Sequence, residues 1–242
     1  MVPWDSEIFG FPVAQITRVA LEEGARSAEA LGEFQTWCDE HAVHLVACRL
    51  DHLELRESMA LEDAGFRFIE MVYRLRLDSF EGIDPPRDVV LVTPASPSDL
   101  SSIEEIASAA FTTGRFLLDW RLPPELSNRR YATWVRNSVD APRHTILKAE
   151  VDGELVGFFI VEDRTDGSVY WHLTAIAPAW QGRGIGSSLW RTVLLRHQME
   201  GATSVETTIS GHNLAILNLY ERLGFSFSSA QMTFHWLREP QP

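Results

Sequence analysis

The chain is poor in the residues that mark several large classes of protein. Its 242 residues include one lysine and two cysteines. Cys38 and Cys48 match no metal-binding or redox spacing, so we predict buried thiols in a reducing, cytoplasmic compartment and no bound metal. No apolar run approaches the roughly 20 residues of a membrane span. The first ten residues carry two acids and no basic cluster, so we expect no membrane contact and no signal peptide.

Basic residues are also scarce, which bears on the choice of partners. The chain has 21 Lys+Arg against 34 Asp+Glu, a formal net charge of −13, and this balance argues against nucleic-acid binding. One region reverses the balance, because six arginines face three acids between residues 115 and 143. That region is either a solvated helical surface or a rim that receives an anionic ligand.

The spacing of apolar residues predicts an α/β chain in two parts. Residues 78–88, with Gly82 and two prolines, favour a linker. We therefore predict a first module over residues 1–80, a linker over 81–87 and a second domain over 88–242. The expected strands are 8–19, 44–50, 68–77, 89–93, 168–177, 204–209 and 232–237, with a hairpin over 145–164 around Asp152-Gly153, and the expected helices are 27–41, 53–64, 96–111, 123–139, 183–198 and 213–223.

A weak internal repeat links the two parts. With an offset of 159 residues, "VACRLDHLELRESMALEDAGFRF" aligns with "VETTISGHNLAILNLYERLGFSF" without a gap and with six identities. Either two amphipathic units are alike by chance, or the first part is a degenerate copy of the second. Asn213 aligns with Glu54 and Tyr220 aligns with Leu61, so we expect the chemistry in the second copy.

A glycine-rich hexapeptide, "QGRGIG", spans residues 181–186 between an expected strand and an expected helix. The N–H groups that open a helix lack intrahelical partners and suit an anion, and glycine lets the anion approach closely. The loop lacks the Gly-Lys-Ser/Thr ending of a phosphate-loop NTPase, and its G-x-G-x-G spacing differs from the dinucleotide fingerprint. The remaining alternative to anion binding is a tight structural turn.

These motifs resemble those of the GNAT acetyltransferases from residue 88 onward. "AIAPAWQGRGIGSSLW" is similar to the family's Q/R-x-x-G-x-G/A motif, and "NLAILNLYERLGF" is similar to its second hallmark. The resemblance implies a mixed, mostly antiparallel GNAT sheet flanked by helices, here preceded by a degenerate GNAT-like half-module. It also implies an acetyl-CoA-dependent N-acetyltransferase whose coenzyme contacts Thr174, Ala175, Ile176, Ala177, Gln181, Gly182, Arg183, Gly184, Ile185, Gly186, Ser187, Asn213 and Tyr220.

A narrower resemblance concerns the acceptor. "WDSEIFG" near the N-terminus and the stretch from "IASAAF" to "DW" resemble the TDP-fucosamine acetyltransferase group. This implies a nucleotide-linked 4-amino-deoxysugar as acceptor. The alternatives are another small amine, such as an aminoglycoside or a biosynthetic intermediate, and a non-catalytic module that binds acyl-CoA. A homodimer is one option for the assembly. The residues expected to approach the acceptor are Trp4, Asp5, Phe9, Arg115, Phe116 and Trp120.

The resemblance also suggests how protons move. Tyr220 is the expected acid for the leaving thiolate, with a core aromatic as the alternative. Many relatives carry a glutamate base where this chain has Tyr170, so the resemblance supplies no carboxylate base at this position. His172 is our candidate, because strand alternation would place it on one face with Tyr170 and Thr174, although a structural histidine is equally compatible.

Three further polar residues are candidates for a role at the site. Glu206 and His212 are weaker candidates for the base. Asn213 either contacts the pantetheine arm or acts only as a helix N-cap.

Overall fold

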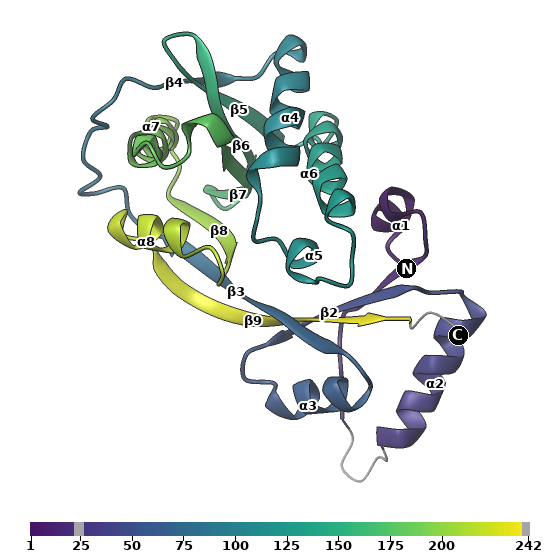
Figure 1. The fold of residues 1–242 in the computed structure, drawn as a ribbon. Helices are drawn as coiled ribbons and strands as arrows, with labels where there is room; N and C mark the ends of the chain where they lie inside the picture. The colour runs from purple at the N-terminus through teal and green to yellow at the C-terminus, as the bar shows by residue number, and fades with distance from the viewer. Residues whose placement is uncertain (22–26, 239–242) are drawn as a thin grey trace. The chain divides into compact units, whose positions relative to one another are not determined.

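The computed structural model describes residues 1–21 and 27–238 and divides into two compact units (Figure 1). The first unit comprises Met1–Val72 and Ser229–Pro242, and the second comprises Tyr73–Ser228. Strands β3 (Arg67–Leu77) and β9 (Ser226–Leu237) each cross from one unit into the other. The division therefore precedes the predicted linker over 81–87, and the last strand groups largely with the first unit. Each unit is described by itself below.

The first unit is a small α/β layer. Its strand β1 pairs in parallel with β2, and β2 pairs antiparallel with β9. The expected strand over 8–19 is wrong at its start, because a helix ended by Gly10 at φ +75° occupies the first residues. The elements are α1 (Pro3–Phe9), β1 (Val13–Ile16), α2 (Ser27–Glu40), β2 (Leu45–Asp51) and α3 (Leu55–Asp63).

The second unit holds the larger sheet, with strand order β3-β8-β7-β6-β5-β4. Neighbours from β4 to β7 are antiparallel, whereas β7 and β8 are parallel, so the predicted mixed, mostly antiparallel sheet is confirmed. The elements are β4 (Leu91–Pro94), α4 (Leu100–Ala110), α5 (Arg115–Leu118), α6 (Pro124–Val139), β5 (His144–Val151), β6 (Glu154–Asp163), β7 (Ser168–Ile176), α7 (Ile185–Met199), β8 (Ser204–Ser210) and α8 (Leu214–Arg222), with 3₁₀ turns at Pro97–Asp99 and Pro178–Trp180.

Helices cover both faces of this sheet. The apolar side chains of α7 and α8 pack against one face, around Trp171, Trp190 and Phe159. Those of α4 and α6 pack against the other face, around Phe158 and Ile160. Figure 1 shows α7 on one side of β5 and β6, and α4 and α6 on the opposite side.

Local sequence signals account for several element boundaries. Ser96 forms a capping box with Asp99 ahead of α4, and Pro124 opens α6. The β5–β6 turn places Asp152 and Gly153 at φ +51° and +81°, as a two-residue Asp-Gly turn requires. Among the described residues, every helix is too short or too polar to cross a bilayer.

The internal repeat is also present in the secondary structure. β2 and β8, α3 and α8, and β3 and β9 begin at residues that are each 159 positions apart. β2 pairs with β9, and β8 neighbours β3, so the first strand of each copy lies beside the third strand of the other. This agreement of boundaries favours duplication over chance. It also explains why β9 groups with the first unit.

Candidate active site

The glycine loop leads from the Pro178–Trp180 turn into α7. Gly182 and Gly184 adopt φ +74° and +83°, a left-handed conformation that favours glycine. Gly184 is the N-cap of α7, and no side chain caps this helix. The N–H groups of the first turn are therefore open to an anion.

A cavity of about 460 Å³ lies over this loop. Gln181 anchors the loop, because its amide nitrogen donates to the Ile176 carbonyl at 3.0 Å. The cavity is lined by Ala110, Phe111, Thr112, Thr113, Thr174, Ala175, Ile176, Gln181, Gly182, Gly184, Gly186, Ser187, Trp190, Asn213, Ala215, Ile216, Leu219 and Arg222.

Most of the expected coenzyme contacts meet in this cavity, and four do not line it. Ala177 and Ile185 pack into the core, and the Arg183 guanidinium lies 5.3 Å from the centre of the Trp180 ring. Tyr220 is 1% exposed and lies behind the cavity wall. Asn213 is the N-cap of α8, because its side chain accepts from the Ile216 N–H at 3.3 Å, and it also lines the cavity, so its contact with the pantetheine arm stays a prediction.

Strands β7 and β8 diverge at the cavity. Their parallel pairing runs from Ser168 with Ser204 to Trp171 with Thr207 and includes no later residue of these two fully described strands. The edge of β7 that faces β8 is consequently open beyond Trp171. Thr174 and Ala175 line the cavity there, so an extended ligand can pair with backbone groups in place of the missing strand.

A β-bulge corrects one of our expectations about β7. In the pairing with β6, Ile160 faces Leu173 and Val161 faces Trp171, so His172 is an extra residue. Trp171 packs toward α7, whereas Leu173 packs toward α4 and α6. The expected shared face holds for Tyr170 and His172, whose ring centres lie 4.7 Å apart, but it is wrong for Thr174, which lies on the Tyr220 side because the bulge resets the alternation.

His172 belongs to a hydrogen-bonded cluster on the face of the sheet that α4 and α6 cover, where Glu162 follows Phe158 and Ile160 along β6. Its Nε2 lies 2.8 Å from Glu162 Oε2, and Glu162 also pairs with Arg143 at 2.9 Å. Burial lowers the pKa of His172, although the hydrogen bond to Glu162 acts in the opposite direction. The hydrogen bond from His172 lowers the pKa of Glu162, so this carboxylate is ionised and accepts from Nε2. The Nδ1 lone pair of a neutral imidazole is then available.

The same cluster contains the donors for a metal ion. His144, Glu162 and His172 each offer one atom, and the three atoms lie within 4.8 Å of one another. Two imidazoles and a carboxylate suit zinc. In this structure, however, the Arg143 guanidinium and the His172 ring already occupy the Glu162 carboxylate. The positive charge of a guanidinium also repels a divalent cation. We therefore interpret His172 and Glu162 as a hydrogen-bonded pair.

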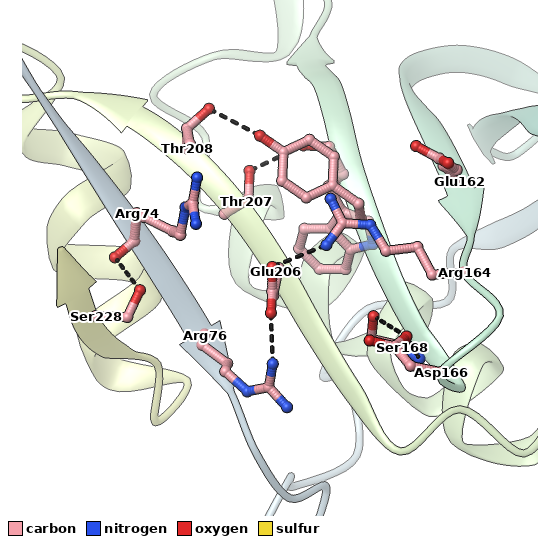
Figure 2. Close-up of polar contacts among 12 residues, drawn as sticks. Arg74, Arg76, Glu162, Arg164, Asp166, Ser168, Glu206, Thr207, Thr208 and Ser228 are labelled. Atoms are coloured by element: carbon pink, nitrogen blue, oxygen red, sulfur yellow. Dashed lines mark hydrogen bonds and ion pairs between the residues drawn. The ribbon is translucent and has the colours of Figure 1, made fainter. Parts of the chain in front are cut away.

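The weaker candidates for the base, Glu206 and His212, lie in different surroundings from His172. Figure 2 shows Arg76 and Arg164 approaching Glu206 from opposite sides. Arg76 donates to one carboxylate oxygen of Glu206, and Arg164 donates to the other at 2.9 Å. Because a guanidinium occupies each oxygen, Glu206 is not arranged to take a proton from an amine. His212 is exposed in the turn before α8. The hydroxyl of Tyr170 lies 3.1 Å from that of Thr208 where the strands diverge.

Tyr220 lies on the α7 side of that divergence. Burial raises its pKa, while the side chains of Trp190, Thr207 and Thr174 act in the opposite direction through hydrogen bonding. Two of these neighbours, Thr174 and Trp190, line the cavity. The hydroxyl is therefore protonated at neutral pH, next to the cavity wall between β7 and β8.

The residues expected to contact the acceptor belong to different units. Trp4, Asp5 and Phe9 lie on α1 of the first unit. In the second unit, the Arg115 guanidinium lies 4.5 Å from the centre of the buried Phe116 ring, and Trp120 is 88% exposed. Within the basic region, acidic partners are bound by Arg121, Arg136 and Arg143. The acceptor assignment stays a prediction.

Comparison with known proteins establishes the family. A model of the acetyltransferase (GNAT) family matches residues 101–225. The matched segment includes the glycine loop, both diverging strands and α8. The chain belongs to the GNAT acetyltransferases and is an N-acetyltransferase.

Two curated relatives are similar over different lengths. The dTDP-fucosamine acetyltransferase of Escherichia coli O6:H1 (strain CFT073) is 25% identical over 97% of this chain and 94% of its own length. The spore coat polysaccharide biosynthesis protein SpsD of Bacillus subtilis (strain 168) is 26% identical over 59% of this chain, but the match covers 49% of SpsD. The chain thus spans nearly all of the first relative and about half of the second.

A solved structure shares the two-part fold. A tandem GNAT protein from the clavulanic acid biosynthesis pathway aligns over 96% of this chain and 77% of its own, with a TM-score of 0.63 and 15% identity. A functionally unknown protein from Staphylococcus epidermidis ATCC 12228 aligns over 88% of this chain and 82% of its own, with a TM-score of 0.65 and 15% identity. These similarities concern the fold alone.

Proposed function

We propose that this enzyme transfers an acetyl group from acetyl-CoA to a primary amine of a small molecule. The observation on which the proposal depends is that the open N-terminus of α7 and the divergence of β7 and β8 share one cavity. The helix N-terminus suits a pyrophosphate, and the open strand edge suits an extended arm that ends at the divergence.

The residues present fit this coenzyme. A Cβ at Gly182 or Gly184 would meet no atom within 4 Å, so the loop leaves room for a bulky anion. Bound there, acetyl-CoA supplies an acyl group activated as a thioester. The rest of the chemistry is the movement of protons, for which this chain offers groups on both faces of the sheet.

His172 is the proposed base and Tyr220 the proposed acid. An amine attacks only when it is neutral, and Nδ1 of His172 can take its proton because Nε2 is committed to Glu162. Tyr220 is protonated at neutral pH and lies on the other side of the divergence. It can protonate the leaving thiolate.

For the acceptor we propose a nucleotide-linked 4-amino-deoxysugar. The support is the similarity to dTDP-fucosamine acetyltransferase along nearly its whole length, which includes the first unit. Arg115, Phe116 and Trp120 of the second unit would contact this acceptor. We further propose that the first unit binds no coenzyme, because it has no counterpart of the glycine loop.

A thiol-release assay with a panel of amines tests the function. We expect release with TDP-4-amino-4,6-dideoxygalactose at a kcat/KM at least about tenfold above that for L-2,4-diaminobutyrate or an aminoglycoside, because a site built for polar groups discriminates strongly. Preference for another amine would reject the sugar and keep the chemistry. Binding of acetyl-CoA with no release for any amine would identify a non-catalytic module.

Replacing Glu162 by glutamine tests the base. The variant should lower kcat and move the acid limb of the pH–rate profile to lower pH. The sign follows because Glu162 raises the pKa of His172, so its removal leaves burial and the neighbouring His144 and Arg164 to lower that pKa further. Glu150→Gln, which removes a surface partner of Lys148 on β5, is the matched control and should leave the profile unchanged. An unmoved acid limb in Glu162→Gln would exclude His172 as the titrating base.

A further inference from the structure

A second cavity adjoins the proposed coenzyme cavity. It measures about 440 Å³ and lies between the 76–84 segment, α7 and the end of α8. Arg222, the last residue of α8, lines both cavities. A ligand that follows α8 out of the first cavity therefore passes Arg222 on entering the second.

Arg222 differs from the other arginines of the second cavity. Arg76 is paired with Asp78 and Glu206, and Arg191 is paired with Asp84 at 3.3 Å. Within the part of the chain that the structure describes, Arg222 makes no ion pair, hydrogen bond or ring contact. Its positive charge is thus available to a ligand.

The position of Arg222 relative to the glycine loop can be traced through Leu219. A Cβ at Gly186, in the first turn of α7, would lie 3.7 Å from Leu219 Cδ2. Arg222 follows Leu219 by three residues, which is close to one helical turn of about 5.4 Å. Arg222 therefore lies about one turn along α8 from Leu219, the residue that faces the first turn of α7.

We propose that Arg222 binds the 3′-phosphate of coenzyme A and that the second cavity receives the attached ribose. This inference rests on the proposed function. In coenzyme A, the 3′-phosphate sits on the same ribose whose 5′-oxygen carries the pyrophosphate, so a single sugar ring separates the two anionic groups. A guanidinium matches the geometry of a phosphate and can donate two parallel hydrogen bonds to it. Arg222 consequently distinguishes coenzyme A from its 3′-dephospho form.

The other charges of the second cavity provide a control. Asp78 and Asp84 each form an ion pair with an arginine, which leaves Glu81 as the carboxylate of the cavity lining that has no cationic partner among the described residues. If Arg222 acted only through the summed electrostatic field of the cavity, neutralising Glu81 would change the ratio of affinities for coenzyme A and its 3′-dephospho form by a comparable factor. A direct contact predicts a large effect of Arg222 and a small effect of Glu81.

The experiment is calorimetric titration of coenzyme A and 3′-dephospho-coenzyme A into the full-length enzyme and three variants. Wild type should bind coenzyme A about tenfold or more tightly than the dephospho form, as a charge-assisted hydrogen bond at a partly exposed site predicts. Arg222→Gln should bind the two ligands about equally. Arg222→Lys should retain part of the preference, and Glu81→Gln should retain nearly all of it. All variants should melt near the wild-type temperature, because Arg222 and Glu81 are exposed and Arg222 makes no ion pair, hydrogen bond or ring contact with any residue that the structure describes.

The outcomes separate this inference from the proposed function. Equal binding of both ligands by wild type would overturn the role of Arg222 and leave the coenzyme site intact. An equal loss of affinity for both ligands in Arg222→Gln would also overturn it, because the lost contact would not involve the 3′-phosphate. No detectable binding of coenzyme A to wild type would reject the proposed function itself.

Discussion

Replacing Gly184 by leucine should lower the affinity for acetyl-CoA by about 10²–10⁴-fold while the enzyme stays folded. The estimate assumes the loss of two charge-assisted hydrogen bonds of about 1.5–3 kcal/mol each between backbone N–H groups and a pyrophosphate. Gly184 lines the cavity and has open space where a Cβ would project, so the leucine side chain would fill the space proposed for the anion. Calorimetry with acetyl-CoA measures the effect.

Backbone strain is the main alternative cause, and Gly201 provides a matched control. Gly184 adopts φ +83°, so any other residue there costs about 1–2 kcal/mol. Gly201 adopts φ +87°, follows the far end of α7, and likewise has no atom within 4 Å of a Cβ. Gly201→Leu should therefore lower the melting temperature by a similar amount and leave coenzyme binding unchanged. Unchanged affinity in Gly184→Leu would remove the loop from the coenzyme site.

The sequence was sufficient for most of the second unit because its signals are local. The capping box at Ser96 and the Asp152-Gly153 turn depend on residues a few positions apart. The offset of 159 residues also predicted equivalent elements, since two copies of one amphipathic unit keep the same boundaries. The short helices α1 and α5 were missed, because helices of one or two turns carry little periodic signal.

The polar cluster could not be predicted, because it depends on two bulges. A regular hairpin closed at Asp152-Gly153 would pair Glu162 with Arg143, but a register shift at Ala149/Glu150 pairs it with His144 instead. The second bulge, in β7, places His172 on the same face as Glu162. Bulges respond to packing across the sheet, which no short segment of sequence specifies. Glu162 was accordingly absent from the sequence-based candidates.

Replacing Tyr220 by phenylalanine should lower turnover by about 10²–10⁴-fold, the usual contribution of a positioned general acid, and leave acetyl-CoA affinity nearly intact. The ring is retained, so its packing against Phe225 at 4.8 Å and Trp171 at 6.3 Å between ring centres should survive. An interaction formed only in the transition state lowers kcat and kcat/KM together. Because a thiolate leaves readily without help, we expect the lower end of the range.

A purely structural role for the buried Tyr220 predicts a different result. A tyrosine that only supports the cavity wall would, on losing its hydroxyl, loosen Thr174, Trp190 and Thr207, with a lower melting temperature and a normal kcat. Tyr73→Phe, which removes a hydroxyl from a ring packed on Phe227, controls for the general effect of the substitution. If Tyr220→Phe turns over within about threefold of wild type, below the range for a general acid, with chemistry shown to be rate-limiting, Tyr220 is not the acid. Solvent that enters between β7 and β8 would then protonate the thiolate.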